Sequence, residues 1–316
     1  MTTRFEHFWI LGLAVVLAFG SNPAAQASDG DPLPSWNEGA NKSAILEFVA
    51  ASTNEDGADF IPIEDRIATF DMDGTLVVEK PKAAVSVFSS QYLSGIAEAN
   101  PNLDIQPYRA IREADEDYLA KNVVQVLNAA GAGLPQSEYR DRVTAFGKTF
   151  KHERFDKPFG ELFYAPMIEL VSYLKANAFS VYIVSGSAQG FVRGFAKEAT
   201  GLPQRQMIGT QWVLDFQGDG FMRTARFRNL GVAAAGKPVI IQYQIGQKPV
   251  FAFGNTWGDQ QMLEYVLSHK DYKKLALWLD HDDEAREYLY DGRVKPADGL
   301  LKVSMKNDFK KLFAHD

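Results

Sequence analysis

The sequence predicts an α/β fold with a parallel sheet, into which a block of helices and a small β-hairpin are inserted. Three short apolar runs, Ile67–Phe70, Val181–Val184 and Val250–Phe253, have the pattern of parallel strands covered on both faces. Segments with helix-like apolar spacing separate them. Each run ends near polar or Gly residues, and open α/β sheets bind ligands at that edge.

A short helix at about Asn41–Ala51 is expected to pack onto the core before the first strand, and Pro62 closes the loop after it. Beyond Thr75 the pattern is helical, at Val85–Ala99, Gln106–Ala130 and, more weakly, Glu138–Phe150. No strand pattern interrupts this block. A helical insertion that follows the first strand directly is typical of a cap that closes over a site and excludes water.

From Glu161 the pattern returns to α/β. Pro166 opens a helix, and Leu275–Leu279 is a further candidate strand. Gln211–Phe227 alternates weakly around the turn residues Gln217–Gly220, which predicts a β-hairpin. The predicted domains are therefore a first part of the core at 28–80, a helical cap at 81–160, and a second part of the core at 161–316 with the hairpin at about 211–227.

Residues 1–27 have the features of a secretory signal peptide. Arg4 supplies the positive start, Phe8–Phe19 is an apolar run that is short for a bilayer, and Ala25-Gln26-Ala27 has the small-x-small form of a cleavage site. We therefore expect a periplasmic or secreted protein, not held in the membrane after cleavage. The alternative is an uncleaved segment that anchors the chain.

Composition excludes several classes of function. The net charge of −7 argues against a general nucleic-acid binder, so no nucleic-acid partner is expected. The chain has no cysteine, which excludes disulfides, thiol catalysis and thiolate metal sites. The sequence leaves the oligomeric state open.

The stretch Asp71-Met72-Asp73-Gly74-Thr75 follows the first predicted strand. Residues i and i+2 of a strand point to the same side, so Asp71 and Asp73 are expected to converge. Two converging carboxylates repel unless a cation or a shared proton intervenes, and Mg²⁺ suits an all-oxygen site that also holds a phosphate. One Asp can attack phosphorus, while the other passes a proton to the leaving group and later takes one from water.

Two further segments offer phosphate-binding groups. The Ser185 hydroxyl is a hydrogen-bond donor at the end of the second strand, and Gly186 allows backbone N–H groups to approach the same phosphate oxygens. Lys237, between Gly236 and Pro238, would neutralise charge between nucleophile and phosphate. Lys248, which also precedes a Pro, is the competing candidate.

These residues and the loop Gly254-Asn255-Thr256-Trp257-Gly258-Asp259 resemble, in order, the four motifs of the haloacid dehalogenase superfamily of phosphohydrolases. The resemblance covers about Arg66–Met262, with the cap matching in position only, and is greatest to secreted acid-phosphatase or phosphoserine-phosphatase-like members. It implies a Rossmann-like α/β core with a helical cap, in which Asp71 is the nucleophile and Asp73 the acid and base.

The resemblance also implies a Mg²⁺ site formed by Asp71, the Asp73 backbone carbonyl, Asn255 and Asp259. Asn255 departs from the family pattern, in which an Asp is common, and the amide brings no charge. Asp259 is then either a direct ligand or an acceptor that orients metal-bound water.

The expected function is Mg²⁺-dependent hydrolysis of a small phosphomonoester through an aspartyl-phosphate. The alternatives are a phosphotransferase and a non-catalytic periplasmic anion-binding protein. A dehalogenase is disfavoured, because Asp73 and the metal loop would have no purpose in it.

Three weaker features remain. The basic residues Lys148, Lys151, His152, Arg154 and Lys157 are expected to form a solvated helix face, or else a patch for a second anionic group of the substrate. His281-Asp282-Asp283 is expected to open a helix. Trp257 is expected either in the core or as a wall against the substrate.

Overall fold

The computed structural model describes residues 30–229 and 231–316. The predicted signal peptide, 1–27, lies outside the described residues, so it stays a prediction. Within the described part of the chain, no helix is both long and apolar enough to cross a membrane.

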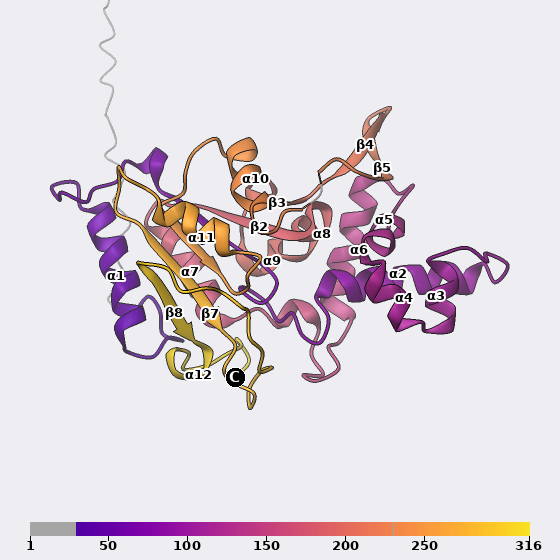
Figure 1. The fold of residues 1–316 in the computed structure, drawn as a ribbon, viewed down its shortest axis with the longest axis horizontal. Helices are drawn as coiled ribbons and strands as arrows, with labels where there is room; N and C mark the ends of the chain where they lie inside the picture. The colour runs from indigo at the N-terminus through magenta and orange to yellow at the C-terminus, as the bar shows by residue number, and fades with distance from the viewer. Residues whose placement is uncertain (1–29, 230) are drawn as a thin grey trace, which may run out of the picture. The chain divides into compact units, whose positions relative to one another are not determined.

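A six-stranded parallel sheet forms the centre of residues 31–316 (Figure 1). Its strand order is β3-β2-β1-β6-β7-β8, and every neighbouring pair is parallel. The strands are β1 (Ile67–Phe70), β2 (Ser180–Ala188), β3 (Met207–Thr210), β6 (Phe251–Gly254), β7 (Leu275–Asp280) and β8 (Leu300–Ser304). The chain runs outward from β1 to β3 and then returns to β6 on the other side of β1. The ends of β1 and β6 therefore form the switch point where such sheets bind ligands.

Helices cover both faces of this sheet, which explains why its central strands are apolar throughout. Phe251 and Phe253 of β6 belong to a core cluster shared with α1 (Ala40–Thr53) and α7 (Ala165–Ala176). Ala252, between them, packs in a second cluster with residues of α10 (Gly236–Gln244) and α11 (Gln260–Leu267). Alternate residues of one strand thus enter opposite layers. The predicted Rossmann-like α/β core is confirmed.

The segment after β1 is helical, as predicted, and lies beyond one end of the sheet in Figure 1. Its helices are α2 (Ala84–Ala99), α3 (Tyr108–Glu113), α4 (Glu116–Lys121), α5 (Val123–Ala129) and α6 (Gln136–Thr149). All five fall within the predicted cap at 81–160, and the role of a cap stays a prediction. The stretch predicted as one helix, Gln106–Ala130, is three helices because Ala114 adopts a left-handed conformation and Asp115 caps α4.

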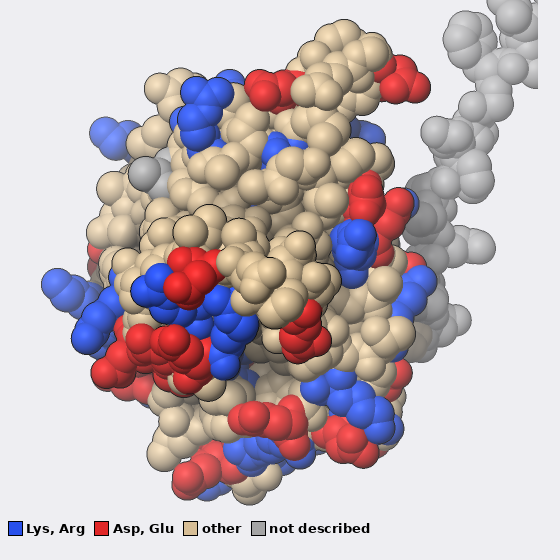
Figure 2. Space-filling view, turned by 90° about the vertical axis from the view of Figure 1, so that its right-hand side faces the viewer, with Lys and Arg blue, Asp and Glu red and all other residues tan. Residues whose placement is uncertain are grey.

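The predicted hairpin is also present. Strands β4 (Trp212–Gln217) and β5 (Gly220–Phe227) pair antiparallel, and β5 is tied to the helical segment by backbone bonds between Arg223 and both Gly133 and Leu134. The hairpin projects at the top of Figure 2, where few charged side chains lie at its tip. On the lower part of the same face, basic and acidic side chains alternate.

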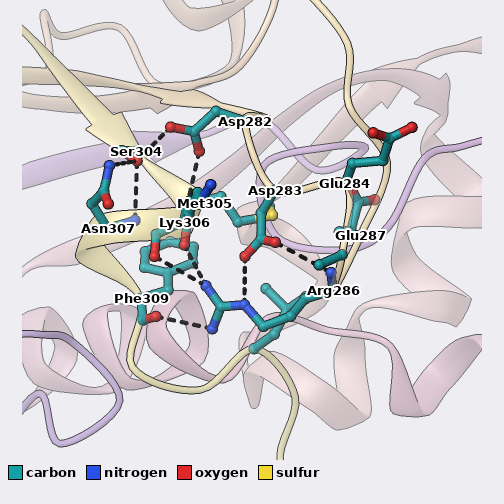
Figure 3. Close-up of polar contacts among 12 residues, drawn as sticks. Asp282, Asp283, Glu284, Arg286, Glu287, Ser304, Met305, Lys306, Asn307 and Phe309 are labelled. Carbon is teal, nitrogen blue, oxygen red and sulfur yellow. Dashed lines mark hydrogen bonds and ion pairs between the residues drawn. The ribbon is translucent and has the colours of Figure 1, made fainter.

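The remaining helices are α8 (Gln189–Phe195), α9 (Lys197–Thr200) and α12 (Met305–Asp308), with single turns of 3₁₀ helix at Ile63–Asp65, Phe159–Glu161 and Gln204–Gln206. The expectation of a helix at His281-Asp282-Asp283 was wrong. Asp282 accepts from Ser304 and from the backbone of Lys306, so it anchors the C-terminal segment instead (Figure 3).

Candidate active site

The two aspartates of the first motif converge directly beyond β1. The backbone N–H of Asp71 donates to the carbonyl of Phe253 at 2.9 Å, which ties the loop after β1 to the end of β6. Beyond that carbonyl lies Asn255, so the first and last motifs meet at the switch point of the sheet. The strand order thereby brings together residues 180 positions apart, such as Thr75 and Asn255.

Lys237 lies between two carboxylates, whereas its competitor Lys248 lies elsewhere. Its ammonium is 2.5 Å from Asp71 and 2.6 Å from Asp259, and it donates to the carbonyl of Val184 at 2.6 Å. Burial lowers the pKa of Lys237, but the charges of Asp259 and Asp71 outweigh it and leave that pKa raised. Lys237 is therefore a fixed positive charge beside Asp71. Lys248 instead bonds Ser268 at an exposed position.

Asp71 itself is buried beside other acids. Burial raises its pKa well above the usual range, the charges of Asp259 and Asp73 raise it further, and Lys237 opposes them. Such a group gains from any cation that enters the site, because a cation stabilises its charged form.

Asp73 is held by the end of β2. Ser187 donates to Asp73 Oδ2 at 2.7 Å and Ser185 donates to the same atom at 3.3 Å. Burial raises the pKa of Asp73 to about 6, with hydrogen bonds from both serines opposing the rise and the charge of Glu79 adding to it. Its other oxygen, Oδ1, is buried with no hydrogen-bond partner. Asp73 is thus poised to exchange a proton near neutral pH.

Gly74 allows the loop to turn back beneath these acids. Its φ is +77°, and a Cβ there would lie 2.0 Å from the Asn255 amide nitrogen and 2.7 Å from Glu79 Oε1. A side chain at this position is therefore excluded both by conformation and by space. The space is filled by an amide–carboxylate contact, in which Asn255 Nδ2 donates to Glu79 at 3.0 Å. The Asn255 carbonyl accepts from Thr75 at 3.2 Å.

Asp259 organises the loop after β6. Its Oδ2 accepts from the backbone N–H groups of Asn255 and Thr256, both at 2.9 Å, while its Oδ1 pairs with Lys237. Both carboxylate oxygens are therefore already engaged. A Cβ on Gly254 would lie 2.4 Å from the Asp259 Cβ, so this glycine permits the close approach.

A buried polar network supports the loop from below. His281 bonds the Gly74 carbonyl through Nε2 at 2.7 Å and Glu287 through Nδ1 at 3.1 Å. Tyr164 donates to the same glutamate at 3.3 Å, and the Tyr290 ring stacks on His281 with centroids 4.1 Å apart.

The segment that carries this network is fixed at its other side. Arg286 pairs with Asp283 and donates to the carbonyls of Met305 and Phe309 at 2.8 and 3.0 Å (Figure 3). The C-terminal strand and helix thus hold in place the residues that contact the catalytic loop.

The acids open onto a pocket of about 240 Å³. Asp71, Asp73, Glu79 and Asp259 line it, together with Gly186 and Ser187 from β2. Val85 of α2 and Leu127 of α5 supply apolar surface from the helical segment. In the described parts of the chain, 30–229 and 231–316, no group of three or more His, Cys, Asp or Glu side chains is already arranged around a metal position.

All seven predicted site residues thus lie together, namely Asp71, Asp73, Ser185, Gly186, Lys237, Asn255 and Asp259. Sequence reasoning missed the donor role of Ser187, although its spacing from Ser185 places both on one side of the strand. It also missed Glu79 and the His281–Glu287 pair. No motif marks Glu79, and His281 was assigned to a helix start.

The weaker expectations have mixed outcomes. Trp257 is half exposed, so it is not a core residue. The basic residues do not share a helix face, because α6 ends at Thr149 before four of them. Lys148 pairs with Glu198, and His152 is buried against the carbonyl of Lys80.

Comparisons with known proteins agree with this geometry. The sequence profile described as haloacid dehalogenase-like hydrolase matches residues 68–264. A comparison with curated proteins gives no significant match. Among solved structures, a conserved functionally unknown protein from Anaerococcus prevotii DSM 20548 is 14% identical with a TM-score of 0.52, over 77% of this chain and 86% of that chain. This likeness shows a shared fold.

Two other solved structures have lower TM-scores. A protein of unknown function from Bordetella pertussis Tohama I is 17% identical with a TM-score of 0.47, over 68% of this chain and 89% of that one. A phosphoserine phosphohydrolase-like protein from Francisella tularensis subsp. tularensis SCHU S4 is 16% identical with a TM-score of 0.37, over 68% and 86%. Since the family profile spans well over half of the chain and its motifs meet at one site, this protein belongs to the haloacid dehalogenase-like hydrolase family.

Proposed function

We propose that this protein is a Mg²⁺-dependent phosphomonoester hydrolase that acts on a small phosphorylated metabolite through an aspartyl-phosphate. The observation that carries the proposal is the pairing of two unlike aspartates in one pocket. Asp71 is paired with a fixed ammonium at 2.5 Å, whereas Asp73 is held by the hydroxyl groups of Ser185 and Ser187. Two carboxyls with such different surroundings suit a nucleophile and an acid–base group, respectively.

In the proposed reaction, a carboxylate oxygen of Asp71 attacks phosphorus while the bond to the leaving alcohol breaks. Asp73 gives its proton to the leaving oxygen, and an aspartyl-phosphate remains. Water then attacks phosphorus and passes a proton to Asp73, while the bond between phosphorus and the Asp71 oxygen breaks. Phosphate leaves, and both carboxyls are restored. Lys237, Ser185 and the N–H groups around Gly186 would stabilise the charge on the phosphoryl oxygens.

The residues fit a divalent cation. Four acids line the pocket, and Lys237 is paired with two of them, Asp71 and Asp259. The buried Oδ1 of Asp73 has no partner, and the pKa of Asp71 is raised by burial and by its acidic neighbours. A dication would relieve both. When bound, it would supply further positive charge for the phosphate.

For the ligands, we propose Asp71, the Asp73 backbone carbonyl and the Asn255 carbonyl. Asp259 is better suited to an indirect role, because its oxygens already hold Lys237 and two backbone N–H groups. Glu79, bonded to the Asn255 amide, would supply the negative charge that Asn255 lacks.

We further propose that the helices of residues 81–160 act as a cap and that the protein is exported. Val85 and Leu127 line the catalytic pocket, so the helical segment contacts whatever the phosphate is attached to. A pocket of about 240 Å³ favours a small leaving group. Export rests on the signal-like residues 1–27 alone.

The test is hydrolysis of p-nitrophenyl phosphate with added Mg²⁺, with EDTA, and with EDTA followed by excess Mg²⁺. Activity that is lost with EDTA and restored by Mg²⁺ is the expected result. Absence of turnover under all conditions would leave the non-catalytic anion-binding alternative. Transfer of phosphate to an added alcohol at the expense of free phosphate would identify a phosphotransferase. A screen of phosphorylated metabolites would then define the substrate.

A further inference from the structure

A second cavity, of about 300 Å³, lies where α6, α8 and β3 meet the hairpin β4–β5. It shares no lining residue with the catalytic pocket. Three of its lining residues are arginines, Arg193, Arg223 and Arg228, and none is acidic. This concentration of positive charge is unusual in a chain whose net charge is −7.

The three arginines have no carboxylate partner in the part of the chain that the structure describes. Ion pairs of arginine are formed there by Arg109, Arg112, Arg142 and Arg286, which all lie elsewhere. The cavity arginines bond only neutral groups. Arg193 donates to the carbonyl of Gln204 at 3.0 Å, and Arg228 donates to the side chain of Gln211 at 2.9 Å. Their positive charge is therefore not neutralised within the protein.

Arg223 carries the strongest indication of a ligand. It is 2% exposed, and its guanidinium lies between the rings of Tyr139 and Trp212, at 4.1 and 4.0 Å from their centroids. One terminal nitrogen donates to the carbonyl of Leu127 at 3.1 Å, but Nε is buried with no hydrogen-bond partner. A buried donor without a partner costs stability, and so does a buried charge without a counterion. The stacked rings hold that guanidinium rigidly in place.

Glutamine side chains add neutral donors around the same space. Gln136, Gln189 and Gln211 all line the cavity, and Gln136 is the first residue of the 14-residue helix α6, whose positive end adds to the field. Burial lowers the pKa of Arg193, and the charge of Arg140 lowers it further. The charged form of Arg193 is thus destabilised at this position, and a bound anion would stabilise it.

We propose that this cavity binds a small free metabolite through a phosphate or carboxylate group, at a site separate from the catalytic pocket. Guanidinium groups match the oxygens of both anions, and several converging on one cavity favour an oxyanion over a neutral ligand.

A side-chain hydrogen bond links the cavity to the catalytic pocket. Thr210, which lines the cavity, donates to the carbonyl of Gly186 at 2.7 Å, and Gly186 lines the catalytic pocket. Gln189 lies two residues beyond Ser187 on the same stretch of chain. An anion in the cavity would therefore contact the same stretch of chain as the end of β2 that holds Asp73.

The test is calorimetric titration of the full protein with inorganic phosphate and, separately, with succinate as the carboxylate probe. Phosphate is expected to bind at two classes of site, since the catalytic pocket also takes it. Arg193→Gln and Arg228→Gln are expected to weaken one class about tenfold or more, as for the loss of a charge-assisted hydrogen bond, and to leave the other unchanged. Arg228 is exposed, so that variant is expected to fold. The probe whose binding the two variants weaken more, phosphate or succinate, identifies the kind of anion that the cavity binds.

Arg226→Gln is the matched control, because Arg226 is an exposed arginine of the same hairpin that does not line the cavity. Equal weakening by Arg226→Gln would mean that general charge, and not the cavity, governs binding, and would overturn the proposal. A single class of phosphate site that both cavity variants leave unchanged would also overturn it. So would a raised KM for substrates with a second anionic group, with no change in phosphate binding, because the cavity would then belong to the substrate site.

Discussion

Replacing Asp73 by Asn is expected to make this protein more stable at pH 7 while it impairs catalysis. Folding moves the Asp73 carboxyl from water into a buried site beside other acids, which raises its pKa from 3.8 to about 6. That difference in pKa corresponds to about 3 kcal/mol. At neutral pH the charged Asp73 therefore lowers the free energy of unfolding by up to this amount. An amide avoids this cost, and its carbonyl can still accept from Ser185 and Ser187.

The pH dependence of the stability gain shows whether the buried charge of Asp73 is its cause. Between about pH 4 and pH 6 the native carboxyl binds more protons than the unfolded one, so the stability that it contributes is present in acid and is lost as pH rises through about 6. Asp73→Asn has no such group. Its advantage over the natural protein is therefore expected to be up to about 3 kcal/mol at pH 7 and close to zero near pH 4.

The measurement is urea unfolding of both proteins at pH 4, 5.5 and 7, in EDTA so that no dication neutralises the acids. Asp298→Asn, which changes an exposed acid, is the control and is expected to alter stability by less than about 0.5 kcal/mol. An equal gain at pH 4 and pH 7, or no gain at all, would refute the reasoning. Adding Mg²⁺ at pH 7 is expected to narrow the difference, because a bound cation stabilises the charged acids of the natural protein.

Three further predictions concern the same site. Asp71→Asn is expected to lower kcat for p-nitrophenyl phosphate by at least about a thousandfold with the fold intact by circular dichroism, and near-normal turnover would rule out the covalent mechanism. Asn255→Asp is expected to lower the Mg²⁺ concentration for half-maximal activity by roughly tenfold; an unchanged value would place Asn255 away from the metal. His281→Ala is expected to lower the free energy of unfolding by about 3 kcal/mol, because it removes the imidazole that pairs with the fully buried Glu287 and leaves that carboxylate with hydrogen bonds from Tyr164 and the Tyr288 backbone. An accompanying Glu287→Gln change is expected to recover part of that loss in urea unfolding.

The parts of the fold that could be predicted are those that carry their own local pattern. The strands β1, β2, β6 and β7 are apolar runs, because helices cover both of their faces. The edge strands β3 and β8 went unpredicted. Met207–Thr210 has a glycine inside the strand, at Gly209, and Leu300–Ser304 carries Lys302, so neither has a continuous apolar pattern. These two segments are strands because they pair with β2 and β7, and a short stretch of sequence does not encode such pairing.

The same distinction applies to the site. Asp71, Asp73 and Ser185 come together near the ends of predicted strands, and Lys237, which was placed by its resemblance to a family motif, lies beside Asp71. Other contacts depend on the tertiary arrangement of distant segments. His281 reaches the Gly74 carbonyl across 207 positions, and the loop that carries it is held by Arg286 and the C-terminal helix. The acidic residues after His281 predicted the start of a helix from local sequence alone. The structure is instead determined by the contact between His281 and the distant Gly74 carbonyl.

Glu79 explains why the site can carry an uncharged amide at Asn255. A carboxylate at 255 would lie at hydrogen-bond distance from the Glu79 carboxylate, which now accepts from the Asn255 amide at 3.0 Å. Asp71 and Asp73, whose pKa values are already raised, lie in the same pocket. A fifth acid there would raise the free energy of the metal-free protein further, because like charges in a buried site repel strongly. The amide avoids that repulsion while keeping a carbonyl oxygen available, and Glu79 keeps the net negative charge that a Mg²⁺ site needs. The departure of Asn255 from the family pattern is therefore consistent with a site in which Glu79 carries the negative charge in place of residue 255. It does not imply that the metal site is lost.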